Sequence, residues 1–434
     1  MPSSWSEGLA RPASRLLLAC VLDVVLGRLA HADGFLRDGM GPIPAGRGAT
    51  NVAHADNGSV LLDNPAALAG IEPAAMADLH LGQYLFAFRY SDAENAFAAG
   101  TGTPLPIADV AYVARSETSE RLGYGFGLFV PAGFGADYEL GTSPVFGPGR
   151  HAYRSFAAFA KLVAGVGYRA TDRLSVGAHL GLAGSYVELR LPYWVQTGRL
   201  AGTPVGVRIR GIGFAPAWAI GAQWAAAPGT VLGASYTAPS DFEADVAGRA
   251  RIDLAGTRDE FDSSIALGLP RAVAVGFRHD VGPRSRLSGE VTWRNWSAAF
   301  DRIRFELTRG KGALGVTNVG DQVHLGWKDT YTVGLGYELY LTPEATVRLG
   351  YTHHPSPVPD STLTPVIPVT LEHVLALGFG WRIGEAQLDL SYQYTFGPTR
   401  HVARSSLVGG DHDASSLTVD GHAWFVGFIR HWRP

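Results

Sequence analysis

The amino-acid sequence predicts an all-β protein, namely a 14-stranded antiparallel transmembrane β-barrel with an N-terminal plug that contains short helical turns. Three observations lead to this prediction. Apolar and polar residues alternate along many segments, aromatic residues gather at the ends of the apolar faces, and short connections alternate with long ones. Together these patterns favour strands that cross a bilayer and close on themselves.

The composition agrees with this fold class. Charged residues make up 17% of the 434 residues, below the roughly 25% of an average soluble protein, while the chain has 55 glycines, 16 tyrosines and 20 phenylalanines. The net charge of −3 argues against a nucleic-acid partner, which usually requires a clustered basic face. No run of 18 apolar residues follows residue 33, so any membrane crossing must be made by strands.

Residues 1–32 are typical of a secretory signal peptide. Arg15 precedes the apolar run 16–26, and residues 30–32 form an A-x-A cleavage pattern. Asp23 interrupts the apolar run, so an extension from an upstream start site remains an alternative. Lipidation at Cys20 is a second alternative, although the apolar run continues past it.

Alternation is clearest between residues 160 and 186. One face of the first segment carries Ala160, Leu162, Ala164, Val166 and Tyr168, while the other carries Lys161, Val163, Gly165, Gly167 and Arg169. The segment 174–186 repeats the pattern. The strands of a soluble β-sandwich also alternate apolar and polar residues, because one face of each sheet contacts water. Alternation alone is therefore compatible with both folds.

The positions of the aromatic residues distinguish a membrane barrel from a soluble β-sandwich. Aromatic residues stand at the ends of the apolar faces of several segments; examples are Tyr168, Tyr186, Tyr236, Tyr351 and Trp381. In transmembrane barrels, aromatic residues at these positions form girdles at the two membrane interfaces. The opposite faces are rich in glycine, serine, threonine and charged residues. This distribution favours a barrel whose apolar face meets lipid.

The connections favour the same conclusion. Fourteen strand centres fall near residues 83, 110, 126, 161, 180, 216, 238, 274, 295, 334, 348, 377, 391 and 427. Links after even-numbered strands are short, whereas those after odd-numbered strands are long, for example 191–206, 249–267, 309–326 and 353–371. Transmembrane barrels sort their loops in this way, with the short turns in the periplasm.

The segment 33–73 precedes the predicted barrel, which occupies residues 74–434. It is rich in glycine and proline and has too few large apolar residues to fold alone. Within it, Asp63 or Asn64 can cap a helical turn that starts at Pro65 and ends at Gly70. Because both barrel termini should be periplasmic, we expect this segment to enter the lumen as a plug.

Several strings resemble the FadL/TodX family of outer-membrane transporters for long-chain fatty acids and hydrophobic aromatic compounds. The string "GRGATNVAHADNGSVLLDNPAALAGI" is similar to the family's N-terminal hatch, and "FVPAGFGADY" to its third-strand region. The strings "LGASYTAPSDFEADVAG", "WRNWSAAFDRI" and "WKDTYTVGLGYEL" resemble later strands. The chain departs from the family at its end, where Trp432 is followed by Arg433 and Pro434 rather than being terminal.

The resemblance implies roles for two groups of residues. Asn64, Pro65 and Ala66 would form the hatch element, either one that moves with ligand or a static cap. Pro131 and Gly133 would mark a kink of the third strand, since proline and glycine weaken a sheet ladder. The resemblance implies that ligand leaves sideways through a gap at this kink. An ordinary strand end is the alternative.

Two further groups are candidates for ligand contact. Leu191, Tyr193 and Trp194 form an apolar patch in a predicted external loop, which favours capture of hydrophobic ligands or packing against other loops. Arg208 and Arg210 alternate with valine and isoleucine, so we expect them to point into the lumen. There they could pair with a ligand carboxylate or with lumen acids.

The expected function is passive transport of hydrophobic small molecules across the outer membrane. A water-filled porin and a non-transporting surface or adhesin-like barrel are the alternatives. We expect no enzyme activity, cofactor or metal site, because no nucleophile elbow, phosphate-binding loop or zinc-binding helix motif occurs. The expected partners are the hydrophobic ligand, outer-membrane lipid and the barrel-assembly machinery, and the expected state is a monomer.

Overall fold

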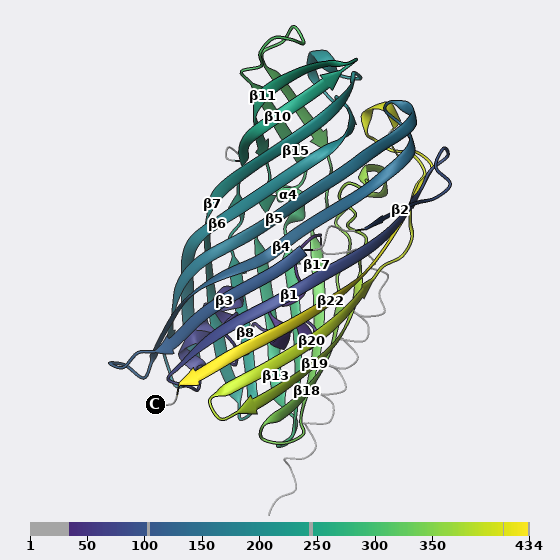
Figure 1. Ribbon diagram of the computed structural model, residues 1–434. Coiled ribbons are helices and arrows are strands. Elements are labelled where there is room, and N and C mark those ends of the chain that lie inside the picture. The colour runs from purple at the N-terminus through teal and green to yellow at the C-terminus, as the bar shows by residue number, and fades with distance from the viewer. Residues whose placement is uncertain (1–33, 102–104, 243–245, 411, 433–434) are drawn as a thin grey trace, which may run out of the picture. The chain divides into compact units, whose positions relative to one another are not determined.

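The computed structural model describes residues 34–101, 105–242, 246–410 and 412–432. The predicted signal peptide and the Arg433–Pro434 end therefore lie outside the described residues. Fourteen antiparallel strands form a closed barrel (Figure 1). They are β1 (Ala75–Ser91), β3 (Leu105–Arg115), β4 (Leu122–Ser143), β5 (Gly147–Arg169), β6 (Leu174–Trp194), β7 (Pro204–Ala227), β8 (Thr230–Thr237), β13 (Ala272–Asp280), β14 (Ser285–Arg294), β17 (Thr330–Tyr340), β18 (Ala345–His353), β19 (His373–Ile383), β20 (Ala386–Phe396) and β22 (Ser415–Trp432).

The barrel closes between its first and last strands. β1 and β22 pair antiparallel from Ala75 opposite Trp432 to Ser91 opposite Ser416. Twelve of the fourteen predicted strand centres fall inside these strands, and the other two, residues 238 and 295, lie one residue past the ends of β8 and β14. The predicted short turns are found between the strands, for example at 170–173 and 341–344. The predicted centres thus fall within, or one residue beyond, each of the fourteen strands.

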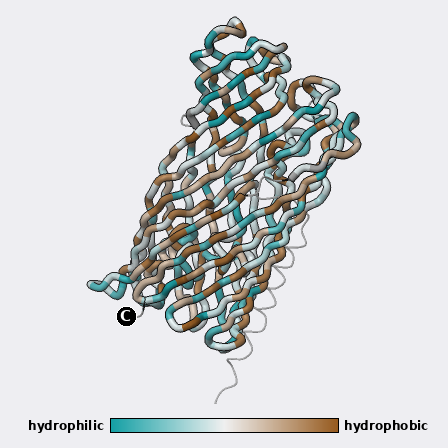
Figure 2. Tube along the Cα trace, in the orientation of Figure 1, coloured by the Kyte–Doolittle hydropathy of each residue, from teal (hydrophilic) through white to brown (hydrophobic). Residues whose placement is uncertain are grey.

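The side-chain faces follow the predicted alternation within the membrane region. Along β7 the outward residues Ile212, Phe214, Trp218 and Ile220 are exposed, whereas the intervening Ala215 and Ala217 are buried. Figure 2 shows hydrophobic and hydrophilic residues alternating along the strands, with hydrophilic residues at the turns. Since these exposed apolar side chains of β7 lie on the outer face, this face is the one that fits lipid.

Several strands continue beyond the membrane region and form an extension (Figure 1). Its other elements are β2 (Ala98–Thr101), β9 (Ser240–Asp241), β10 (Val246–Leu254), β11 (Thr257–Ala266), β12 (Gly268–Leu269), β15 (Arg302–Thr308), β16 (Val319–His324), β21 (Arg400–Val402), α4 (Trp296–Ala299), η2 (Gly198–Leu200), η3 (Asp360–Thr362) and η4 (Val408–Gly410). The external connections are consequently shorter than predicted. Most of the predicted loop 249–267 is strand, and β4 and β5 are joined by residues 144–146 alone.

The segment 34–73 lies inside the barrel. It contains α2 (Pro42–Gly46), α3 (Val60–Asp63) and η1 (Pro65–Gly70), and almost all of its side chains are buried. α2 contacts β18, β19 and β20, while η1 contacts β5, β6 and β7. Across the described residues, the helices lack the length and apolar character needed to cross a membrane.

Inward-facing glycines make room for this plug. A Cβ at Gly177 would lie 2.5 Å from the backbone nitrogen of Ala66, and a Cβ at Gly123 or Gly221 would overlap Leu68 or Asn64. Only a strand without side chains at these positions lets the plug backbone approach so closely. The glycine-rich face of the sequence is therefore a docking surface for the plug.

Candidate functional site

The extension encloses an apolar cavity of about 80 Å³, which we call the external pocket. Its walls come from β6, β7, β10, β11, β15 and β16; they include Leu189, Leu191, Tyr193, Val207, Ile209, Ile252, Phe261, Phe305 and Leu307. The Tyr193 hydroxyl donates a 2.6 Å hydrogen bond to Asp321. The pocket can therefore accept an apolar molecule with only a few polar groups at its edge.

Two of the three predicted capture residues line this pocket. Leu191 and Tyr193 face it, but Trp194 lies on the other face of β6. The Trp194 indole packs beside Gly409, where a Cβ would lie 2.6 Å from its ring. Trp194 thus holds the connection around η4 and is not a lining residue.

The prediction that Arg208 and Arg210 point into the lumen is wrong. Both are exposed on the outer face of β7, whereas Val207 and Ile209 are buried and line the external pocket. The prediction assumed that apolar residues always face outward, as they do in lipid. Beyond the bilayer the outer face meets water, so the same alternation places the arginines outside.

A cluster of aromatic side chains lies around Phe35 of the plug. The Phe35 ring centroid is 5.1 to 6.1 Å from those of Phe134, Phe159, Trp296, Phe300 and Trp327. We call these six residues the aromatic cluster. Sequence reasoning missed it, although Trp296, Phe300 and Trp327 lie in the strings that carry the family resemblance.

The pairing of strand β4 is irregular near Pro131. Its pairing with β5 has a register shift between Phe129 and Ala132. Its ladder with β3, as far as the described residues show, ends where Val110 lies opposite Leu128. Pro131 and Gly133 thus lie beyond the end of the β3–β4 ladder and beside the register shift.

The plug closes this break from the inside. The Arg37 backbone N–H donates to Pro131 O at 3.0 Å, and the Gly133 N–H donates to Phe35 O at 3.1 Å. The Arg37 guanidinium forms a 2.8 Å ion pair with Asp109 of β3, and both side chains are buried. Residues 35–37, which we call the closing segment, therefore replace β3 as the partner of β4.

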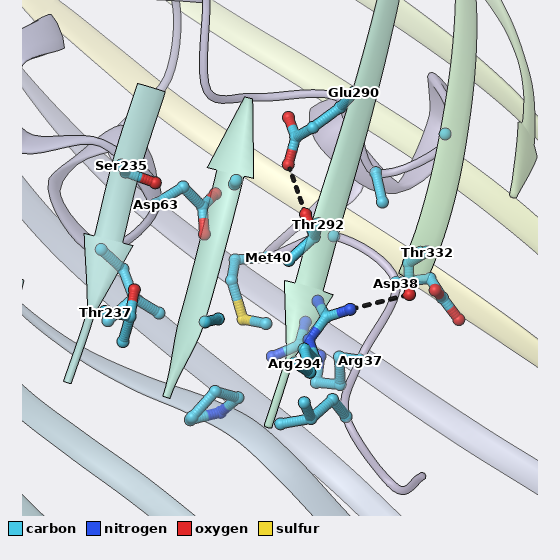
Figure 3. Close-up of a pocket in the computed structure, with 18 of the residues that line it drawn as sticks. Arg37, Asp38, Met40, Asp63, Ser235, Thr237, Glu290, Thr292, Arg294 and Thr332 are labelled. Carbon is cyan, nitrogen blue, oxygen red and sulfur yellow. Dashed lines mark hydrogen bonds between the residues drawn. The ribbon is translucent and has the colours of Figure 1, made fainter. Parts of the chain in front are cut away.

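A second cavity of about 150 Å³, the lumen pocket, lies between the plug and the wall (Figure 3). Its lining is mixed and includes Leu36, Met40, Asp63, Pro131, Lys161, Glu290, Thr292, Arg294 and Thr332. Arg294 donates a 2.8 Å hydrogen bond to Thr332. Lys161 on β5 is 5% exposed, and among the described residues it has neither an ion pair nor a hydrogen bond. The lumen pocket could hold an amphipathic molecule.

Asn64, Pro65 and Ala66 lie at the base of the plug and are fully or almost fully buried. The Asn64 side-chain amide donates to the carbonyls of Val52 at 2.7 Å and Ala222 of β7 at 3.0 Å, while its oxygen accepts from the Ala66 N–H at 3.2 Å. Asn64 thus caps η1 as predicted and also ties it to the barrel wall.

One group of side chains has the spacing of metal ligands. Atoms of His54, Asp56 and Glu338 lie within 4.8 Å of one another. However, the Arg47 guanidinium is 2.7 Å from Asp56 and 3.5 Å from Glu338, so a cation would meet an existing positive charge. Burial and the Arg47 charge also lower the pKa of His54 to about 4. The group is best described as an ion-paired anchor of the plug.

The family model described as "Outer membrane protein transport protein (OMPP1/FadL/TodX)" matches residues 25–431. The chain belongs to this family. Its members are outer-membrane transport proteins and not enzymes.

Individual relatives are distant in sequence. The chain is 25% identical over 168 residues to the long-chain fatty acid transport protein of Escherichia coli O6:H1, a match that covers 38% of the chain and 35% of that relative. A Pseudomonas aeruginosa FadL homologue superposes with a TM-score of 0.76 at 16% identity, covering 92% of this chain and all of the other. The P. putida toluene transporter TodX gives 0.75 at 18% identity, covering 92% and 99%. These structures support the family's fold for this chain.

Proposed function

We propose that this family member passively transports hydrophobic small molecules across the outer membrane. The ligand is captured in the external pocket, binds in the lumen pocket and leaves sideways where β4 separates from β3. One observation carries the proposal. The closing segment supplies Phe35 to the aromatic cluster, lines the lumen pocket through Leu36 and Arg37, and forms backbone hydrogen bonds to Pro131 and Gly133 of β4.

Capture needs no energy source beyond burial of apolar surface. Each square ångström of ligand surface removed from water contributes about 25 cal/mol, which offsets the low aqueous concentration of such a ligand. The external pocket supplies this burial through leucine, valine, isoleucine and phenylalanine side chains. Transport down a gradient follows if each later site offers similar burial.

The lumen pocket favours an amphipathic ligand over a purely apolar one. Lys161 is a buried cation without an acidic partner among the described residues, so a ligand carboxylate would supply the missing charge. This supports a long-chain fatty acid, the substrate named for the E. coli relative, over an aromatic hydrocarbon such as toluene, named for TodX. Arg294 and Thr332 lie in the same pocket and could share the headgroup.

Release requires the closing segment to move. Its two backbone hydrogen bonds to β4 and the Arg37 ion pair with Asp109 would have to open together. The carbonyl of Pro131 and the N–H of Gly133 would then border a passage from the lumen pocket into the membrane. Asn64, Pro65 and Ala66 would remain as the fixed base of the hatch, because Asn64 is bonded to β7.

The remaining partners follow from the closed barrel. A single chain supplies all fourteen strands, so the proposed pathway is complete in a monomer surrounded by outer-membrane lipid. We expect the barrel-assembly machinery to insert it. Division into a signal peptide (1–32), a plug (33–73) and a barrel (74–434) is part of the same proposal.

The decisive experiment uses liposomes that contain the purified protein. We expect uptake of a labelled fatty acid with little ion current. High conductance without uptake would favour a water-filled porin, and neither activity would favour a non-transporting surface barrel. The variant Lys161→Met should reduce uptake of the fatty acid but not that of toluene, which tests the assigned substrate class.

A disulfide tests the exit route. Leu36 and Ala132 are bridge partners, so Leu36→Cys with Ala132→Cys can be cross-linked across the closing segment. We expect oxidation to stop release from the barrel and reduction to restore it, while Leu36→Cys alone should be insensitive. Normal transport by the oxidised protein would refute lateral exit at this site.

A further inference from the structure

Four arginines stand side by side on the outer face of the extension. Arg154 of β5 lies opposite Arg190 of β6, Arg190 opposite Arg208 of β7, and Arg208 opposite Arg251 of β10. We call them the arginine row. Figure 1 shows these four strands as neighbours in the sheet. With about 4.8 Å between strands, the row spans about 14 Å.

Such a row is unfavourable by itself. Like charges directly opposite one another in a sheet repel, because their Cβ atoms are only about 5 Å apart. The two end residues have acids nearby, since Arg154 is 3.9 Å from Asp137 and Arg251 is 3.9 Å from Asp253. Among the described residues, however, no acid forms an ion pair with the central pair, Arg190 and Arg208; Glu188, which lies near Arg208 on the same face, is paired with Arg210 at 3.2 Å. An external anion would supply the missing charge.

The location of the row indicates the source of that anion. On β7 the row is followed on the same outer face by Arg210 and then by the apolar residues Ile212 and Phe214, which are 54% and 56% exposed. On β6, Tyr186 lies four residues from Arg190 on that face. The arginines therefore stand where lipid-facing surface gives way to water. An amphiphile with a phosphorylated head could contact both surfaces at once.

We propose that the arginine row binds the phosphate groups of a phosphorylated saccharide lipid in the outer leaflet, a headgroup of the lipid A type. Guanidinium groups bind phosphate through paired, charge-assisted hydrogen bonds. The acyl chains of the same molecule lie against the apolar face below the row. A free phosphate would leave that apolar face unused, which is why the lipid is the preferred occupant.

Native mass spectrometry of the full-length protein in detergent tests the proposal, with bisphosphorylated and monophosphorylated lipid A as probes. We expect the bisphosphorylated lipid to be retained preferentially. The double variant Arg190→Gln and Arg208→Gln should retain at least about tenfold less. The matched control changes Arg150 and Arg302 to Gln; both are exposed and ion-paired, to Glu139 and Asp301, outside the row. It should behave like the unaltered protein.

Several results would overturn the proposal. They are equal retention of the two lipids, an equal loss in both double variants, or displacement of the lipid by inorganic phosphate alone. The double variant Arg190→Lys and Arg208→Lys keeps the charge and should retain more lipid than the glutamine variant. If it loses as much, the paired hydrogen bonds of the guanidinium groups, which an ammonium group cannot form, hold the phosphates rather than charge alone. Heat-modifiable migration on a gel confirms that each variant is folded before it is compared.

Discussion

The membrane part of the barrel and its extension use the same strands with opposite polarity. On β7 the membrane part exposes Phe214 and Trp218 outside and places alanine and glycine inside. In the extension the same strand exposes Arg208 outside and places Val207 and Ile209 inside. The alternation of faces runs without interruption from one part to the other, and only the solvent outside changes.

The interiors differ for a related reason. In the membrane part the lumen is filled by the plug, whose backbone approaches the wall so closely that glycine is needed at Gly123, Gly177 and Gly221. In the extension no plug is present among the described residues, and large apolar side chains face one another around the external pocket. The period of two fixes which residues share a face. The residue types on the inner face depend on whether the plug or a pocket occupies the lumen, and those on the outer face depend on whether lipid or water surrounds the strand.

The largest expected effect comes from charging the lipid-facing surface. Leu180 lies near the middle of the apolar outer face of β6 and is 68% exposed. Leu180→Arg should destabilise the barrel by about 2 to 4 kcal/mol, because lipid solvates the guanidinium poorly. The measurement is reversible urea unfolding in vesicles.

The reverse exchange on the same strand provides the control. Arg190 lies on the same face as Leu180 but in the extension. Arg190→Leu should change the unfolding free energy by no more than about 0.5 kcal/mol, since its surroundings are aqueous. Similar effects of the two substitutions would mean that the boundary between the two parts is misplaced.

The next effect concerns the inner faces. Gly177→Leu should displace η1 from the wall, destabilise the protein by about 1 to 3 kcal/mol and raise ion conductance, because a side chain there collides with Pro65 and Ala66. Conductance across planar bilayers measures plug displacement directly. Gly184→Leu serves as the matched control, since on the outer face of the same strand a Cβ meets only ordinary contacts with Phe214. Low conductance in both variants would contradict close docking of the plug.

Much of the fold follows from the sequence because its signal is periodic and local. The alternation located the fourteen strands, and the Asn64-Pro65 start of a helical turn was recognised from capping rules alone. The family resemblance also implied a kink at Pro131, and the register of β4 with β5 shifts between Phe129 and Ala132. These features depend on residues that are near one another in the chain.

The site was harder to predict because its parts are distant in the chain. Phe35 contacts Trp296 and Trp327 only in the closed barrel. These residues are far apart in the chain, so no local sequence pattern predicts the contact. The prediction that Arg208 points into the lumen is wrong because the alternation pattern does not show where along β7 the bilayer ends. Lys161 is one polar residue on a strand face, and only in three dimensions is it visible that no acid of the described residues pairs with it.

A smaller effect is expected inside the extension. Ile209→Arg places a guanidinium in the external pocket, and desolvating it should weaken ligand capture at least about tenfold. Saturation binding of a labelled fatty acid to protein in detergent is the measurement. The neighbouring Arg208→Gln, on the outer face, should leave capture unchanged. Equal losses would show that the pocket is not the capture site.

The smallest effect is a local response to pH at the end of the extension. His412 is buried against the Tyr90 hydroxyl, at 3.0 Å from its Nδ1 atom, and burial lowers the pKa of His412 to about 4. A lowered histidine pKa means that the open form binds the proton more readily, so the closed form loses stability as the pH falls below about 6.5. Between pH 6.5 and 5.5 local opening should increase about fivefold, as measured by hydrogen exchange in the connection to β22. The response should vanish in His412→Phe. It should also be absent from the membrane strands of the same molecule, because the openings that let their amides exchange do not expose His412. A pH response of equal size in those strands would mean that acid acts on the whole barrel rather than on this contact.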